Sequence, residues 1–313
     1  MALACNYKVS NKNWVREMCV NNKVNFLAIQ ETKIEKIDMF SVRKCWGNLA
    51  FEFLHSDSVG NSGGILCVWD PNAFRKINYT ISDYFVITRG VWIKNGTDLL
   101  IIVVYAPQDS RDKCMMWDYL VHVVNQWHGE VVIMGDFNEV QYKSDRFGLN
   151  FNVHGADAFN AFISNAGLEE IPLGGSAFTW CHRSATKMSK LDRFFVSNNL
   201  FSTCPHISAI TLDRYLSDHR PILLREKAFD FGPIPFRFFH HWFEIDGFRS
   251  FVSDMWNCAP VDSLNGMRNM AGKLKFPKIN IRKWVNDKRC ERKVLSEKLK
   301  EDLCRLMRSL TRE

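Results

Sequence analysis

Short apolar runs, each bounded by polar or turn-forming residues, recur along the first 226 residues of the chain. Runs of this length that are rich in β-branched and aromatic residues are typical of strands. They read NFLAIQETK, AFEFLHS, GGILCVWD, YFVITRGVWIK, DLLIIVVYAPQ, EVVIMGD, SAFTWCH, KLDRFFVS, HISAITL and HRPILLRE. Apolar residues at helical spacing predict helices at 11–22, 110–127 and 156–166. Many strands with few helices predict an α/β fold of two packed β-sheets flanked by helices.

The pattern changes after residue 228. The segment FDFGPIPFRFFHHWFEIDGF is aromatic and contains two prolines, which predicts an irregular connection. Residues 281–313 repeat leucines at helical spacing (Leu299, Leu303, Leu306 and Leu310), and such a stripe is more often a packing face than a functional one. We therefore expect a domain at 1–228, an aromatic linker at 229–277 and a basic helical extension at 278–313.

Net charge is concentrated in that extension. The chain carries 41 Lys and Arg against 34 Asp and Glu, a formal charge of +7. Residues 278–313 hold 12 of the basic and 6 of the acidic residues, a net +6, so residues 1–277 carry only +1. A basic tail favours unspecific attraction to nucleic acid. The sequence shows neither a membrane-spanning run nor a signal-peptide core, so we expect an intracellular protein that is not secreted.

Polar side chains stand where the apolar strands end, more often than helix and turn capping explains. The set comprises Glu31, Tyr105, Gln108, Asp136, Asn138, Asp192, Asp218 and His219. If the strands share a sheet, these ends converge on one rim. Carboxylate oxygens on such a rim are the ligands of a hard divalent cation, here Mg²⁺, for which Mn²⁺ can substitute.

A rim of this kind suits attack of water on a phosphodiester. Mg²⁺ on Glu31 would neutralise charge on the phosphoryl and leaving oxygens. Asp136 would orient and deprotonate the water, while Asn138 would hold a phosphate oxygen or that carboxylate. A protonated His219 would stabilise the transition state if Asp192 accepts a hydrogen bond from its other nitrogen.

Each of these residues also has a structural interpretation. Asp136 and Asn138 fit a turn in which they hydrogen-bond their own backbone. Asp192 fits an ion pair with the neighbouring Arg193, Asp218 fits a turn, and a single histidine is more often structural than catalytic.

The motifs QETK, YAPQ, GDFNEV, KLDRFFVS and SDHRPI, in this order, resemble the endonuclease/exonuclease/phosphatase superfamily, which includes AP endonucleases and DNase I-like nucleases. The sequence is most similar to the endonuclease domain of plant LINE-type (non-LTR) retrotransposon polyproteins, from about residue 12 onwards. Its aromatic segment and basic helix resemble the linker that precedes the reverse transcriptase in those polyproteins. Each motif alone is weak, but five in order are specific.

The resemblance implies a four-layer sandwich, with two mostly antiparallel sheets between outer helices. It implies that Glu31 and Asp218 serve a metal, and that the catalytic residues are Tyr105, Asp136, Asn138, Asp192 and His219. We further expect phosphate or DNA contacts from Gln30, Gln108, Thr179, Trp180 and Arg193.

One departure from the family pattern concerns the N-terminus. The family begins with a strand that ends in an asparagine beside the metal site, followed by a nearby glycine. Here the chain starts MALACNYKVSNK, and Asn6 is its only counterpart, without the glycine. We therefore expect the first core strand to be degenerate or missing, which would leave unpaired backbone groups in its neighbour.

The leading hypothesis is a Mg²⁺-dependent DNA endonuclease of a non-LTR retrotransposon, which nicks nuclear DNA to prime reverse transcription. Its expected partners are DNA, with the reverse transcriptase domain and RNA of the parent element. The sequence contains no polymerase metal motif (Tyr/Phe-x-Asp-Asp) of its own. One alternative is an impaired remnant that at most binds nucleic acid, and another is a different phosphodiesterase or phosphatase of the same fold.

Overall fold

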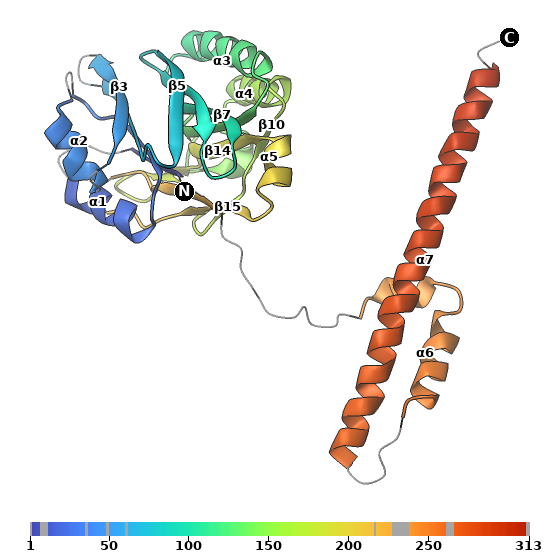
Figure 1. Ribbon diagram of the computed structural model, residues 1–313. Helices are drawn as coiled ribbons and strands as arrows, with labels where there is room; N and C mark the ends of the chain where they lie inside the picture. Colours follow the sequence, from blue (N-terminus) through green and yellow to red (C-terminus); the bar gives the residue numbers. More distant parts are fainter. Residues whose placement is uncertain are drawn as a thin grey trace. The chain divides into compact units, whose positions relative to one another are not determined.

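The computed structural model describes residues 2–6, 12–34, 37–47, 50–59, 62–215, 217–226, 238–260 and 266–310. The chain divides into two compact units, Met1–Phe229 and Asp230–Glu313, and each is described by itself (Figure 1).

Unit 1 contains two large sheets. The seven-stranded sheet has the order β11-β15-β16-β1-β2-β4-β3, and the six-stranded sheet has the order β10-β14-β8-β7-β6-β5. The strands of the first are β1 Ala2–Asn6, β2 Phe26–Gln30, β3 Glu52–Val59, β4 Ser62–Trp69, β11 Leu173–Gly174, β15 Ile207–Thr211 and β16 Ile222–Glu226. Those of the second are β5 Phe74–Ile81, β6 Phe85–Trp92, β7 Thr97–Tyr105, β8 Glu130–Asp136, β10 Leu168–Glu170 and β14 Asp192–Ser197. A small third sheet joins β9 Arg146–Phe147, β12 Trp180–Cys181 and β13 Met188–Ser189.

Three apolar layers hold unit 1 together. The central one lies between the large sheets and includes the fully buried Trp69 and Phe194. A second lies where α1 (Lys12–Asn21) and α2 (Met39–Trp46) cover the first sheet. A third lies where α3 (Ser110–Asn125) and α4 (Val153–Asn165) cover the second. The result is helix, sheet, sheet, helix, which confirms the predicted four-layer sandwich.

Strand β1 occupies the position that we expected to be degenerate or missing, so that expectation was wrong. It runs parallel to β2 and antiparallel to β16, inside the first sheet. Ala4 is 1% exposed and packs in the central layer, while Asn6 pairs in register with Gln30. The segment ALACN lacks β-branched and aromatic residues, so its strand propensity is low. Backbone pairing with a strand on each side stabilises it despite this low propensity.

Sequence patterns also missed several shorter elements. Helix α2 and strand β5 lie in segments that we took as connections, and α5 (Asn198–Thr203) follows β14 directly. Strand β5 escaped notice because most of its side chains are exposed, as befits an edge strand.

Unit 2 is helical, with η3 (His240–Glu244), α6 (Phe248–Asn257) and α7 (Gly266–Leu310). Its small core contains Trp242, Phe248 and Ile281. The expected irregular linker at 229–277 therefore holds η3, α6 and the first part of α7; residues 227–237 lie outside the described part. Helix α7 also includes Pro277 and starts earlier than the 278–313 segment that we expected; it packs on α6 through Trp284, which stacks on Phe251.

The leucine stripe at the end of α7 stays a prediction. Leu299 is 60% exposed, and the side chains of Leu303, Leu306 and Leu310 lie outside the described part. None of the helices that the structure describes is both long and apolar enough to cross a membrane.

Arg193 is fully buried and forms ion pairs that join three segments of unit 1. Its guanidinium donates from Nη1 to both carboxylate oxygens of Glu170 at 2.8 Å, and from Nη2 to Asp145 Oδ2 at 2.7 Å. Gln141 Oε1 lies 3.2 Å from Nη1, and Lys190 also pairs with Glu170. Our expectation that Arg193 contacts DNA was wrong, because the side chain is 0% exposed and its charge is used internally.

We predict that Arg193→Met lowers the free energy of unfolding by about 3–5 kcal/mol, because it removes the buried cation that joins the partly buried carboxylates of Glu170 and Asp145. Chemical denaturation followed by circular dichroism measures this. Arg220→Met is the matched control, since Arg220 pairs only with the exposed Asp213 at 3.4 Å and should cost about 0–1 kcal/mol. Equal losses in the two variants would contradict a structural role for Arg193.

Candidate active site

Strand pairing sets three functional side chains in one row across the second sheet. β7 runs parallel to β8, with Tyr105 opposite Asp136. β14 runs antiparallel to β8, so its first residue, Asp192, also lies opposite Asp136. Two strands that end and one that begins at the same edge therefore bring a phenol and two carboxylates together.

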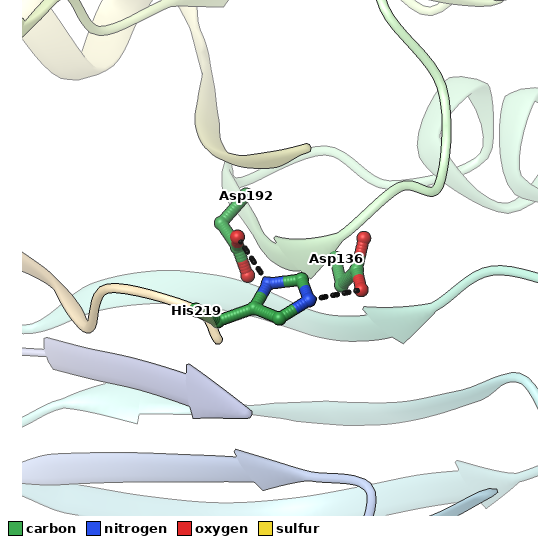
Figure 2. A group of neighbouring side chains, drawn as sticks. All are labelled: Asp136, Asp192 and His219. Carbon is green, nitrogen blue, oxygen red and sulfur yellow. Dashed lines mark hydrogen bonds and ion pairs between the residues drawn. The ribbon is translucent and has the colours of Figure 1, made fainter. Parts of the chain in front are cut away.

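His219 lies between the two aspartates (Figure 2). Its Nδ1 is 2.8 Å from Asp192 Oδ2, and its Nε2 is 3.8 Å from Asp136 Oδ2. All three residues are buried, with exposed fractions of 1% to 7%. Because the two nitrogens face different carboxylates, the ring bridges them.

The electrostatic environment keeps His219 protonated. Burial lowers its pKa, but the negative charges of Asp192 and Asp136, with the hydrogen bond to Asp192, outweigh burial and raise the pKa to about 10. An imidazolium is therefore present throughout the neutral pH range.

Asp136 and Asn138 form a turn as well as part of the site. Asn138 adopts a left-handed backbone (φ 48°), and its N–H donates to Asp136 Oδ1 at 2.9 Å. Its side chain donates to Ala106 O at 2.7 Å and accepts from Gln108 Nε2 at 2.8 Å. Asp136 and Asn138 therefore form the turn that was the structural interpretation of these two residues, and they do not continue β8 as an extended strand. The turn instead fixes one oxygen of Asp136 and leaves the other near His219.

Glu31 joins the site through Tyr105. The Tyr105 hydroxyl donates to Glu31 Oε1 at 2.6 Å, and Lys33 Nζ lies 3.5 Å from Glu31 Oε2. Burial raises the pKa of Tyr105, and so do the hydrogen bond to Glu31 and the carboxylates of Glu31, Asp136 and Asp218. The phenol therefore stays protonated, and three acids from separate segments surround it.

The loop before β16 carries Asp218 and His219 and is held by β12. Cys181 N donates to Asp218 O at 2.9 Å, and Trp180 Nε1 donates to Asp218 Oδ2 at 3.0 Å. Thr179 is 1% exposed, and its hydroxyl accepts from the backbone N–H groups of Leu191 and Asp192, both at 2.9 Å. Thr179 therefore anchors backbone, and our expectation that it contacts DNA was wrong. Trp180 is half-buried and orients Asp218.

Gln30 lies beneath the site rather than on its surface. It is 0% exposed, and a Cβ on Gly135 would come within 2.6 Å of its Nε2 and 2.1 Å of Val104 O. Only glycine allows β8 to approach this closely. A direct contact of Gln30 with DNA was thus a wrong expectation, because the other sheet covers it. Gln108 is exposed beside Asn138 and can reach a ligand.

Sequence reasoning missed two supporting residues. Lys113 is 7% exposed, and its ammonium donates to Asn138 O at 2.7 Å and to Glu139 Oε2 at 2.9 Å. No local pattern marks a helical lysine as buried, although Glu139 next to the GDFN motif was a signal. The sequence analysis named Asn6 but gave it no role in the site. Its register with Gln30 places it beside the strand end that carries Glu31.

A divalent cation fits the donors of this site. Among the described residues, Asp136, Asp192 and His219 form the group whose ligand atoms lie closest together. In that group each His219 nitrogen already faces a carboxylate, which favours a proton-bearing role for the ring. Glu31, whose side chain is 34% exposed, and the exposed Asp218 are the carboxylates open to a hard cation.

Comparisons with known proteins agree with this geometry. Residues 99–223 match the model of a family described as endonuclease-reverse transcriptase, a span that includes Tyr105 to His219. No curated protein matches the chain significantly.

Solved structures share the fold at low identity. An AP endonuclease from Archaeoglobus fulgidus is 14% identical, with a TM-score of 0.58 over 72% of this chain and 99% of that one. The AP endonuclease LMAP from Leishmania major is 13% identical, with a TM-score of 0.58 over 72% and 87%. The endonuclease domain of TRAS1, a telomere-specific non-LTR retrotransposon, is 13% identical, with a TM-score of 0.55 over 72% and 98%.

The family match includes most of the residues that form the site, from Tyr105 to His219, and the solved structures show that the fold is shared with these nucleases.

Proposed function

We propose that unit 1 is a metal-dependent endonuclease that nicks DNA and leaves a 3′-hydroxyl for reverse transcription. The observation that carries this proposal is that strand register sets Tyr105, which hydrogen-bonds Glu31, opposite Asp136 of the Asp136–His219–Asp192 group. It combines an open carboxylate, a neutral phenol, a candidate base and a buried cation. These are the groups that attack of water on a phosphodiester requires.

Asp136 is the group that orients and deprotonates the attacking water. Its Oδ1 accepts the Asn138 N–H, so the carboxylate cannot rotate freely. Its Oδ2 remains directed to the centre of the site, near His219. The water oxygen forms a new bond to phosphorus, its proton passes to Asp136, and the bond to O3′ breaks. The departing O3′ takes a proton from solvent water and becomes the 3′-hydroxyl.

His219 and Tyr105 stabilise the charge that develops on the phosphoryl oxygens. His219 carries a full positive charge at neutral pH, and Tyr105 offers a protonated hydroxyl. Both are positioned before substrate binds, by Asp192 and Glu31 respectively, so little reorganisation is needed in the transition state.

Glu31 and Asp218 would hold the divalent cation, for which we propose Mg²⁺, with Mn²⁺ as a substitute. When bound, it would supply Lewis-acid stabilisation of the phosphoryl and leaving oxygens. Tyr105 and Trp180 would support these two carboxylates, through hydrogen bonds to Glu31 and Asp218 respectively.

DNA as the substrate, a plant LINE-type parent element and a nuclear location are parts of this proposal. The description of the matching family and the likeness to the TRAS1 endonuclease domain support the retrotransposon part of the proposal. The reverse transcriptase domain and RNA of the parent element would then be partners. The main ground for a catalytically impaired remnant was a missing first strand, and β1 removes that ground.

We predict that Asp136→Asn and His219→Ala each reduce nicking of supercoiled plasmid by about 10²- to 10⁴-fold, because each removes a proton-transfer or charge-stabilising group. EDTA should abolish nicking, and Mg²⁺ should restore it. Asp157→Asn and His154→Ala, at exposed positions of α4, are the matched controls. Full nicking in EDTA or in either site variant would refute the assignment.

We also predict that Asp192→Asn moves the alkaline limb of the pH–rate profile to lower pH. In the native chain the folded pKa of His219 is about 10, above its ordinary value of 6.5. The positive charge of His219 therefore raises the free energy of unfolding. This contribution is complete below pH 6.5 and is lost as the pH rises through 10. Asp192→Asn removes the negative charge that raises the pKa of His219 most, so the imidazolium deprotonates at lower pH.

Nicking rates between pH 6 and 10 measure this shift, and NMR titration of His219 measures it independently of activity. Asp157→Asn should keep the native profile. An unchanged alkaline limb and an unchanged His219 titration in Asp192→Asn would contradict the assigned role of Asp192.

A further inference from the structure

Unit 2 contains a cavity of about 570 Å³ between η3 and α7. The η3 side of this cavity is aromatic and is formed by Phe239, His241 and Trp242. The α7 side contributes Arg282, Lys288 and Arg292. The mechanism proposed above uses none of these residues.

The aromatic wall combines rigid and accessible rings. Trp242 is 7% exposed and packs on Phe248, with 5.9 Å between ring centroids. Phe239 is 45% exposed and lies 5.2 Å from Trp242 and 5.6 Å from His241. Trp242 thus anchors the wall in the core of unit 2, while Phe239 and His241 offer open ring faces.

The cationic wall lies along one stretch of helix. Arg282 and Arg292 are both exposed and are ten residues apart, or about 15 Å along the axis. Lys288 lies between them and pairs with Glu291 at 2.7 Å. Guanidinium groups bind phosphate oxygens in a bidentate manner.

We propose that this cavity binds single-stranded nucleic acid, with phosphates on Arg282 and Arg292 and a base stacked on Phe239. Exposed ring faces opposite a row of cations are the combination that single strands use, since any unpaired base offers a π-face. A duplex keeps its bases stacked inside and cannot use the aromatic wall. The inference rests on the proposed function only in taking nucleic acid as the ligand class.

The test uses the full chain, a fluorescent oligothymidine of 20 nucleotides and a duplex of equal length, in EDTA so that neither is cut. Arg282→Gln/Arg292→Gln should weaken single-strand binding about tenfold or more at low salt. It should also reduce the salt slope by about 1.4, because two phosphate contacts each release about 0.7 counterions. Phe239→Leu should weaken single-strand binding roughly tenfold with the salt slope unchanged, because it removes stacking and no charge.

Arg268→Gln/Lys275→Gln is the matched control, since it removes two charges of α7 that do not line the cavity. If the two double variants weaken single-strand binding equally, binding depends on net charge alone and the proposal is overturned. Equal competition by heparin or by the duplex would also overturn it, and so would unchanged binding in Phe239→Leu.

Plasmid nicking by the same variants separates the two proposals. At saturating DNA, the cavity variants should nick at the native rate. If the native chain fails to nick but the variants lose single-strand binding, the proposed function falls and this inference stands. If nicking is intact and single-strand binding is unaffected, the inference falls alone.

Discussion

Everything in the candidate active site depends on how β8 pairs with its two neighbours. Parallel pairing with β7 and antiparallel pairing with β14 set Tyr105 and Asp192 on either side of Asp136. His219 has a partner for each ring nitrogen only because this register holds the two carboxylates at the right separation. A shift by one residue would turn Asp136 to the other face of the sheet, and the imidazolium would lose both its position and its charge.

The site residues were predictable to the extent that their signals were local. Acidic and amide residues at strand ends predicted that Glu31, Asp136 and Asp192 lie close together, and the structure brings them together. The same reasoning failed for Arg193 and Thr179, because a residue's type does not reveal which face of its strand is covered. Their burial depends on η2 (Lys143–Asp145), β10 and β12, which are too short to leave a clear periodicity.

The first strand shows a second limit of sequence patterns. ALACN is too short and too weakly apolar to stand out, but β2 and β16 leave a gap of one strand's width that it fills. Pairing on both edges is a long-range effect, and no window of local sequence contains it. Long apolar strands such as β7 and β8, in contrast, were recognisable from four or more consecutive apolar residues.

The close approach of the sheets at Gly135 has a consequence for how this protein can diverge. Any side chain at that position would meet the backbone carbonyl of Val104. The residue before Asp136 must therefore stay glycine, and the close packing of the strands fixes the position of Asp136. Gln108 follows the end of β7 and Trp180 lies in the short strand β12, so neither is subject to that constraint. Under the proposed function, side chains at these two positions could change with target preference while Asp136 keeps its place.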